Sequence, residues 1–337
     1  MTGIRLLSLA ILICMIAGCV PVRGNADLAS HPPETATNTA PVSSPSTPQG
    51  SSASDTPTDT PRQTSTSTPT ATIAPSLTAT PSPTWVPSET PLPSLTPTLA
   101  GPLIAIDPGH GGKDLGARHF GPDGQMDLTE SDINLSIALD LRDTLLSRGF
   151  RVLLTRDDDY GLNAEGLDVN DNGEIDHVDE AQARVDLINA SEADLLLSIH
   201  QNAFFDETGE PATDVGGTVT FYCADRPFSD DSLMFAHLVQ EELVAAFRTL
   251  GHDVRDRGVE IDLVLYVPGE PGSYLILLGP KTDRIARPCR VPGALSETLF
   301  LTHEGEAALA ADPQALQAIA KAYADAITRY FEQDSHD

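Results

Sequence analysis

Two histidines stand directly after predicted buried strands. His110 follows the apolar residues 103–106 and a short Asp-Pro-Gly turn, and His200 follows the apolar residues 195–199. The carboxyl ends of strands in an open parallel sheet form the ligand crevice, so both imidazoles can converge there. One histidine at a strand end is more often structural than a ligand. A pair of them, with glycines that let the backbone turn tightly around the first, favours a metal site.

A third ligand is available at Glu130, in the first turn of a predicted helix. Two imidazoles and one carboxylate, with a fourth position left for water, form a known catalytic zinc arrangement, whereas structural sites fill all four positions with protein ligands. Taken by itself, Glu130 is better explained as an acid favoured by the dipole at a helix N-terminus. Taken with the histidines, Glu130 is a candidate third ligand beside His110 and His200, and the residues alone leave both explanations open.

The elements that must position these residues follow from the hydrophobic pattern. Near-continuous apolar runs, typical of buried parallel strands, alternate with stretches of helical period. We therefore expect an α/β fold, with a mostly parallel twisted sheet and helices on both faces. The expected strands are residues 103–106, 152–154, 195–199, 217–222, 259–267 and 293–298, and the expected helices are residues 130–148, 181–190, 232–250 and 313–331.

An acidic insertion over residues 160–180 has the spacing of an EF-hand loop. Oxygen-bearing side chains occupy the first, third, fifth, ninth and twelfth loop positions, and glycine occupies the sixth. The last position holds aspartate where glutamate is usual, so bidentate closure is less assured. The predicted calcium ligands are Asp168, Asn170, Asn172, Glu174, Asp176 and Asp179. The alternative is a solvated acidic turn.

The first 19 residues have the pattern of an export signal. Arg5 precedes an apolar run over residues 6–16, which is short for a membrane-spanning helix, although a short membrane anchor is the alternative. The sequence Ile16-Ala17-Gly18-Cys19 resembles the lipobox of bacterial lipoproteins. That resemblance implies an acylated Cys19 and an extracytoplasmic protein anchored to the membrane by lipid. A secreted protein is the alternative.

Residues 20–101 consist largely of Thr, Ser and Pro, with few large apolar side chains. Such a segment cannot bury enough surface to offset its ordering entropy, so we expect a disordered tether. A passive spacer is the favoured reading, and glycosylation is the alternative. The folded domain is therefore expected over residues 102–334. Asp and Glu number 49 against 20 Lys and Arg, which argues against a nucleic-acid partner.

Cysteine usage agrees with export. Cys14 would leave with the signal and Cys19 would be acylated, so Cys223 and Cys289 are the possible intramolecular pair. In an oxidising compartment they either form a disulfide or stay as two buried thiols, and the sequence leaves both open.

The motifs together resemble the zinc-dependent N-acetylmuramoyl-L-alanine amidases of the amidase 3 family. The matching residues are Ile106-Asp107-Pro108-Gly109-His110-Gly111-Gly112, Glu130 with Asn134 and Leu135, Thr155-Arg156, Ser198-Ile199-His200-Gln201-Asn202-Ala203 and Arg257-Gly258-Val259. The resemblance covers residues 103–331 and lies in the joint order of the motifs, because no single motif is decisive.

The resemblance implies that His110, Glu130 and His200 hold zinc and that a glutamate near the last strand is the general base. Residues 292–300 fit that last motif, which assigns the base to Glu297. Glu304 and Glu306 are less favoured, because they lie in a polar segment expected to be exposed. Asn202 and Arg257 either position substrate or order their loops.

The implied reaction is hydrolysis of the amide between the lactyl group of N-acetylmuramic acid and the L-alanine of the peptidoglycan stem peptide. Zinc would activate a water and Glu297 would accept its proton. The implied partner is peptidoglycan, and no protein partner can be inferred.

Departures from the family pattern lie at residues 159–181, 204–215 and 268–290, and they leave the cleft shape and the stem-peptide preference open. The alternatives are a zinc hydrolase of the same fold that acts on another wall-derived amide, and a wall-binding module that has lost catalysis. A binding module has no need of a base, so Glu297 argues against the second.

Overall fold

A computed structural model describes residues 101–264 and 273–334. Residues 1–100, which hold the predicted export signal, Cys19 and nearly all of the tether, lie outside the described residues. Among the described residues, no helix combines the length and the hydrophobicity that a membrane crossing requires.

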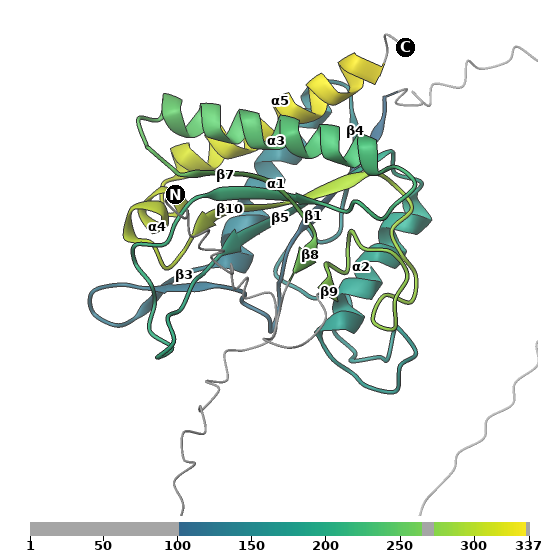
Figure 1. Ribbon diagram of the computed structural model, residues 1–337, viewed down its shortest axis with the longest axis horizontal. Helices are drawn as coiled ribbons and strands as arrows, with labels where there is room; N and C mark the ends of the chain where they lie inside the picture. Colours follow the sequence, from purple (N-terminus) through teal and green to yellow (C-terminus); the bar gives the residue numbers. More distant parts are fainter. Residues whose placement is uncertain (1–100, 265–272, 335–337) are drawn as a thin grey trace, which may run out of the picture. The chain divides into compact units, whose positions relative to one another are not determined.

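A six-stranded sheet forms the centre of the domain (Figure 1). Its strands, in spatial order, are β4 (Arg151–Leu154), β1 (Leu103–Pro108), β5 (Leu195–Asn202), β10 (Gly293–Phe300), β6 (Thr218–Tyr222) and β7 (Asp256–Ile261). Neighbouring strands are parallel except for β10 and β6, which are antiparallel. The expected α/β fold with a mostly parallel sheet is therefore confirmed.

Helices cover both faces of this sheet. The helices α1 (Glu130–Ser147), α3 (Ser229–Thr249) and α5 (Pro313–Asp334) pack together on one face, and α2 (His177–Ser191) packs on the other (Figure 1). Alternate strand residues point to opposite faces. Ile104 and Leu195 accordingly join the core with the three helices, whereas Leu103 and Leu196 join the core with α2.

Helix α1 forms where the apolar spacing predicts it. The Thr129 side chain caps its first turn by accepting a hydrogen bond from the Asp132 amide. Ile133, Ile137, Leu141 and Leu145 form its buried stripe and are at most 4% exposed. The cap fixes the first turn of α1, so Glu130 is held at the edge of the sheet.

The structure corrects several expected boundaries. Helix α2 begins at His177, four residues before the expected start, because Asp176 and Asp179 form a capping box there. The strand expected over residues 259–267 is divided: β7 ends at Ile261, and β8 (Leu263–Val264) pairs with β9 (Ser273–Tyr274) in a separate sheet. Four short elements were not expected, namely β2 (Arg118–Phe120), β3 (Met126–Thr129), β9 and α4 (Glu304–Ala310).

Candidate metal centre

Three neighbouring strands in the middle of the sheet supply most of the candidate site. His110 lies two residues beyond the end of β1, His200 lies in β5, and Glu297 lies in β10. Glu130 is the first residue of α1, which reaches the same end of the sheet. Parallel strands end at one edge, so residues far apart in the sequence meet there.

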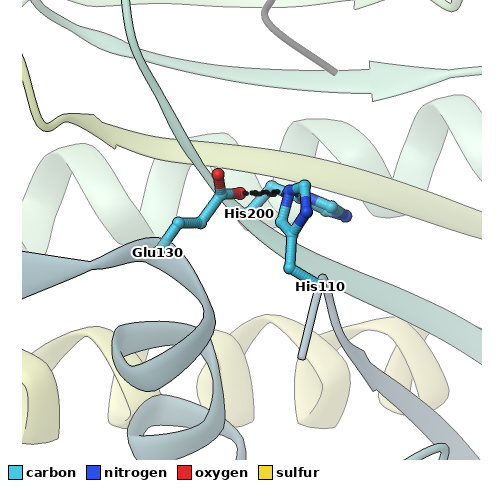
Figure 2. Close-up of side chains that lie close together, drawn as sticks. All are labelled: His110, Glu130 and His200. Atoms are coloured by element: carbon cyan, nitrogen blue, oxygen red, sulfur yellow. Dashed lines mark hydrogen bonds and ion pairs between the residues drawn. The ribbon is translucent and has the colours of Figure 1, made fainter. Parts of the chain in front are cut away.

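The three predicted ligands point toward one another (Figure 2). In the part of the chain that the structure describes, they form the only group of three His, Cys, Asp or Glu residues whose ligand atoms all lie within 4.8 Å of one another. His200 Nδ1 is 2.9 Å and His110 Nε2 is 3.2 Å from Glu130 Oε1. The side chain of Glu130 is 1% exposed, and those of His110 and His200 are each 9% exposed.

The hydrogen bonds around the group fit a metal ion. His110 Nε2 is buried without a hydrogen-bond partner, while its Nδ1 is 2.7 Å from Asp114 Oδ2. A carboxylate on the far ring nitrogen fixes the orientation of a metal-binding imidazole. Glu130 Oε2 accepts a 2.7 Å hydrogen bond from the Ala117 amide, which leaves Oε1 directed at the histidines. Two nitrogens and one oxygen are a ligand set that catalytic zinc uses.

The charges of the group are strongly coupled. Burial alone would lower the pKa of His110, but the carboxylates of Glu130 and Asp114 raise it to about 10. Burial alone would raise the pKa of Glu130, but the imidazoles of His110 and His200 hold it below its usual range. The site therefore favours a positive charge between the imidazoles and Glu130, which a divalent cation can supply in place of a proton.

Glu297 lies beside the histidines on the neighbouring strand. It pairs in register with His200, so the two side chains share one face of the sheet. Its carboxyl group is 1% exposed, and its Oε2 has no hydrogen-bond partner. Burial raises the pKa of Glu297 well above its usual value, repulsion by Glu130 adds to this effect, and His110 opposes it. An apolar strand thus holds a basic carboxyl group with a free oxygen.

Two glycines allow the close packing of the group. A Cβ atom on Gly109 would lie 2.1 Å from the His200 ring, so only glycine permits this approach. Gly116 has a φ of 64° and would place a Cβ 2.4 Å from Glu130 Oε2. These contacts explain why the turn after β1 is rich in glycine.

Sequence analysis assigned no role to several residues around the group. Asp114 orients His110, and Arg156 and Arg184 lie buried behind the turn that carries it. Asp114 stands four residues after His110, and that spacing was the available signal. Arg184 and Glu180 are likewise four residues apart on α2, and such a pair is ordinarily a surface contact.

Asn202 and Arg257, whose roles the sequence left open, have structural partners. Asn202 Oδ1 accepts a hydrogen bond from the Ala203 amide, and Arg257 Nε donates to the Gly216 carbonyl. Both side chains thus make a hydrogen bond to the backbone, but the buried Nδ2 of Asn202 has no partner, and these contacts are compatible with either role. Glu304 is exposed as expected, but Glu306 is 4% exposed, so the expectation of an exposed residue was wrong. Its carboxylate accepts hydrogen bonds from the amides of Gly217 and Phe300, which its position at the start of α4 allows.

The predicted calcium loop is ordered by its own hydrogen bonds. Asp168 accepts from the amides of Asn172 and Gly173, and the side-chain oxygens of Asn170 and Asn172 each accept from an amide two residues ahead. Asp176 and Asp179 cap α2, and Asp179 also accepts from two loop amides. Glu174 is exposed. Among the described residues, these acids do not form a group like that of His110, so calcium binding stays a prediction.

Cys223 and Cys289 are both buried free thiols. Burial, with the nearby Asp262 carboxyl group, raises the pKa of Cys223 to about 12, and burial also raises the pKa of Cys289. The sequence left open a disulfide or two buried thiols, and the structure has two buried thiols. Their raised pKa values make them unreactive.

Comparison with known proteins agrees with this site. A family described as N-acetylmuramoyl-L-alanine amidase matches residues 104–329. The germination-specific N-acetylmuramoyl-L-alanine amidase of Bacillus subtilis (strain 168) is 32% identical over 235 residues, which cover 70% of this chain and 82% of that protein. The amidase AmiA of Salmonella typhimurium is 25% identical over 250 residues, which cover 68% of this chain and 76% of that protein.

A solved structure has the same fold. The CwlD amidase of Clostridioides difficile, determined in complex with the GerS lipoprotein, is 28% identical and has a TM-score of 0.51. The match covers 69% of this chain and 99% of that one. The family match spans nearly the whole domain from β1 to α5, including all four residues of the site, so the chain belongs to the N-acetylmuramoyl-L-alanine amidase family.

Proposed function

We propose that this chain hydrolyses the amide bond between the lactyl group of N-acetylmuramic acid and L-alanine of the peptidoglycan stem peptide, with one zinc ion and a glutamate base. The observation that carries the proposal is the meeting of His110, Glu130 and His200 within 4.8 Å, with Glu297 in register beside His200. A bound zinc ion supplies a Lewis acid that lowers the pKa of water and stabilises negative charge on a carbonyl oxygen.

The protein's own residues divide the remaining work. His110, Glu130 and His200 hold the ion, and Asp114 keeps the free nitrogen of His110 directed at it. Glu297 accepts the proton of the attacking water and returns it to the departing amine of L-alanine. Its raised pKa suits this role, because a carboxyl group of ordinary acidity is a weak base near neutral pH.

Glu297 also favours catalysis over a wall-binding role. A buried carboxyl group with an unpaired oxygen lowers the free energy of unfolding unless a partner or a function offsets the cost. A module that only binds peptidoglycan gains nothing from such a group. The same site would serve a zinc hydrolase acting on another wall-derived amide, so the products of digestion must decide between the two substrates.

The test is digestion of purified peptidoglycan by the purified full-length chain, with and without a chelator, followed by mass analysis. We expect release of intact stem peptides with a free L-alanine amino group, loss of that release on chelation, and recovery when zinc is added back. Cleavage within the glycan strand or within the stem peptide would refute the proposal, and so would full activity of metal-free protein.

The proposed location follows from the substrate and from the first 19 residues, which lie outside the described part of the chain. Peptidoglycan lies outside the cytoplasmic membrane, so the enzyme must be exported. We propose that Cys19 carries the lipid that keeps the chain at the membrane, and that residues 20–101 span the distance to the wall.

A further inference from the structure

A buried guanidinium group lies directly behind the turn that carries His110. Arg184 is 3% exposed and comes from α2, on the face of the sheet opposite α1. We infer that Arg184 is a positioning residue for the metal site, and that it sets the backbone geometry of His110. This inference rests on the proposed zinc site and adds to it a residue that does not touch the ion.

Both terminal nitrogens of the Arg184 guanidinium group donate hydrogen bonds to this turn. Nη1 donates to the Pro108 carbonyl at 2.8 Å and to Asp107 Oδ1 at 3.0 Å, and Nη2 donates to the His110 carbonyl at 2.6 Å. Nε donates to Glu180 Oε1 at 3.0 Å. A planar guanidinium can span such a set of acceptors, whereas a lysine ammonium is a single point of charge.

The turn needs this support because its backbone is strained. His110 has a φ of 62°, in the left-handed region that non-glycine residues rarely adopt. Strained residues persist where the surrounding structure over-determines their conformation. With its carbonyl fixed by Arg184 and its Nδ1 fixed by Asp114, His110 presents Nε2 to Glu130. Without the first contact, the backbone is free to relax and turn the imidazole away from the other ligands.

A second buried arginine also holds this turn, but it does not contact the His110 carbonyl. Arg156 donates to the carbonyls of Pro108, at 2.9 Å, and Gly109, at 3.0 Å. The His110 carbonyl, which belongs to the ligand itself, is held by Arg184. Arg184 therefore controls the residue whose backbone angle determines the direction of the imidazole.

The same arginine connects the acidic insertion to the metal site. Glu180, its neighbour on α2, accepts hydrogen bonds from the amides of Leu162 at 2.9 Å and Asn163 at 2.7 Å. The start of the insertion is therefore hydrogen-bonded to Glu180, the same side chain that accepts from Arg184. A shift of α2 along its axis would move Arg184, which donates to the His110 carbonyl. The position of α2 therefore affects the position of His110.

The experiment measures metal binding as well as catalysis in the full-length chain. Arg184→Lys keeps the charge beside Asp107 but loses the fork, and Arg287→Lys is the matched control. Arg287 contacts the same helix and insertion through Asp186 and the Val169 carbonyl, away from the metal turn. The readouts are the zinc dissociation constant by competition with a chromogenic chelator, the visible spectrum of the Co²⁺ form, and kcat and KM on peptidoglycan.

We expect Arg184→Lys to weaken zinc binding about 10- to 100-fold, as is typical for residues that orient metal ligands. The Co²⁺ spectrum should change and kcat should fall with little change in KM, while Arg287→Lys behaves as the wild type. Wild-type zinc affinity with an unchanged Co²⁺ spectrum in Arg184→Lys would overturn the inference, whatever happens to the melting temperature.

Two further outcomes are separable. If the wild-type chain binds no zinc, the proposed function itself fails. If Arg184→Lys does not fold, Glu180→Gln provides the test, because it weakens the anchor of Nε and leaves the fork in place. The inference then requires weaker zinc binding and a changed Co²⁺ spectrum in Glu180→Gln, and wild-type values for both would reject it.

Discussion

Glu297 combines two properties that rarely occur together in a folded protein. Its carboxyl group lies in an apolar strand between Leu295 and Leu299, and its Oε2 has no hydrogen-bond partner. The Tyr323 hydroxyl, also buried, bonds to the side chains of Ser296 and Thr298 on either side of it. The neighbours of Glu297 are thus satisfied by the core, and Glu297 is left available for the site.

Replacing this carboxyl group separates catalysis from metal binding. Glu297→Gln should lower kcat on peptidoglycan about 10²- to 10⁴-fold, because an amide cannot accept the water proton. Its zinc content should match that of the wild type, since the three ligands stay in place. Glu304→Gln is the control, because that side chain is 77% exposed, and it should keep full activity. Substantial turnover by Glu297→Gln would exclude Glu297 as the base.

Residue types at strand ends were enough to predict the two histidines of the site, but not its two glutamates. The two histidines follow apolar runs, and Glu130 and Glu297 follow from the order of the motifs. Asp114 and Arg184 were missed for a physical reason. Each acts through a hydrogen bond to His110, and such a partner depends on tertiary geometry rather than on residue type.

Asp262, like Glu297, is a buried carboxyl group with an unpaired oxygen, and it directly follows the last residue of β7. It is 1% exposed, its Oδ2 has no partner, and burial raises its pKa to about 7. The folded protein thus holds this proton more tightly than the unfolded chain does. Its contribution to stability is full below about pH 4 and is lost as the pH rises through about 7.

Asp262→Asn should therefore be more stable than the wild type at high pH and similar to it at low pH. The difference in the free energy of unfolding should grow by up to about 1.4 kcal/mol for each pH unit between these limits. Urea unfolding at about pH 5 and about pH 8 measures it. An equal difference at both pH values would show that Asp262 stays ionised in the folded protein.

At the scale of elements, long periodic segments were predicted well and short ones were not. Helix α1 has four apolar residues on one stripe and a clear cap, so its bounds were predictable. The hairpin of β2 and β3 and the short helix α4 have at most seven residues each, too few for a hydrophobic period to appear. The burial of Glu306 was missed along with α4.

The start of α2 has a different explanation. Asp176 and Asp179 were assigned to calcium, and in the structure they form the capping box of α2. Both functions need the same oxygen atoms, and the sequence pattern is compatible with either. The Asp168 carboxylate accepts hydrogen bonds from the amides of Asn172 and Gly173. These bonds hold the sharp turn at Gly173 that a calcium loop requires.

Calcium binding to this loop predicts a stability change. Millimolar calcium should raise the melting temperature of the wild-type chain, because an ion that binds the folded loop stabilises it by mass action. Asp168→Ala should abolish the rise. Asp206→Ala, in an exposed loop outside the insertion, is the control and should retain it. A melting temperature that calcium leaves unchanged in the wild type would reject the prediction.

At the scale of the whole molecule, the site depends on the order of strands in the sheet. β1, β5 and β10 are central neighbours, although they are widely separated along the chain. The sequence predicted each strand but not this order, because strand pairing depends on tertiary contacts. The antiparallel direction of β6 against β10 was likewise absent from the hydrophobic pattern.

The proposed lipid anchor predicts where the chain is found in a cell. Cys19→Ser should move the protein from the membrane fraction to the soluble fraction or the medium, because no acyl chains would then hold it. Cys14→Ser keeps the lipobox and is the control, so it should stay with the membrane. Fractionation followed by immunoblotting measures both. Wild-type membrane retention of Cys19→Ser would reject lipid anchoring at Cys19 and favour the short membrane anchor.

The strand order has a consequence for the lifetime of the enzyme. Because β1 must pair with β5 before His110 can meet His200, an unfolded chain has no assembled zinc site to offer. At the proposed site, zinc would act as a stabilising ligand of the native state, worth about 2.7 kcal/mol at a free concentration 100 times its dissociation constant. If the chain acts outside the cell as proposed, metal-free chains would open more often to proteases when zinc is scarce. Scarcity would therefore reduce the number of surviving enzyme molecules as well as the activity of each one.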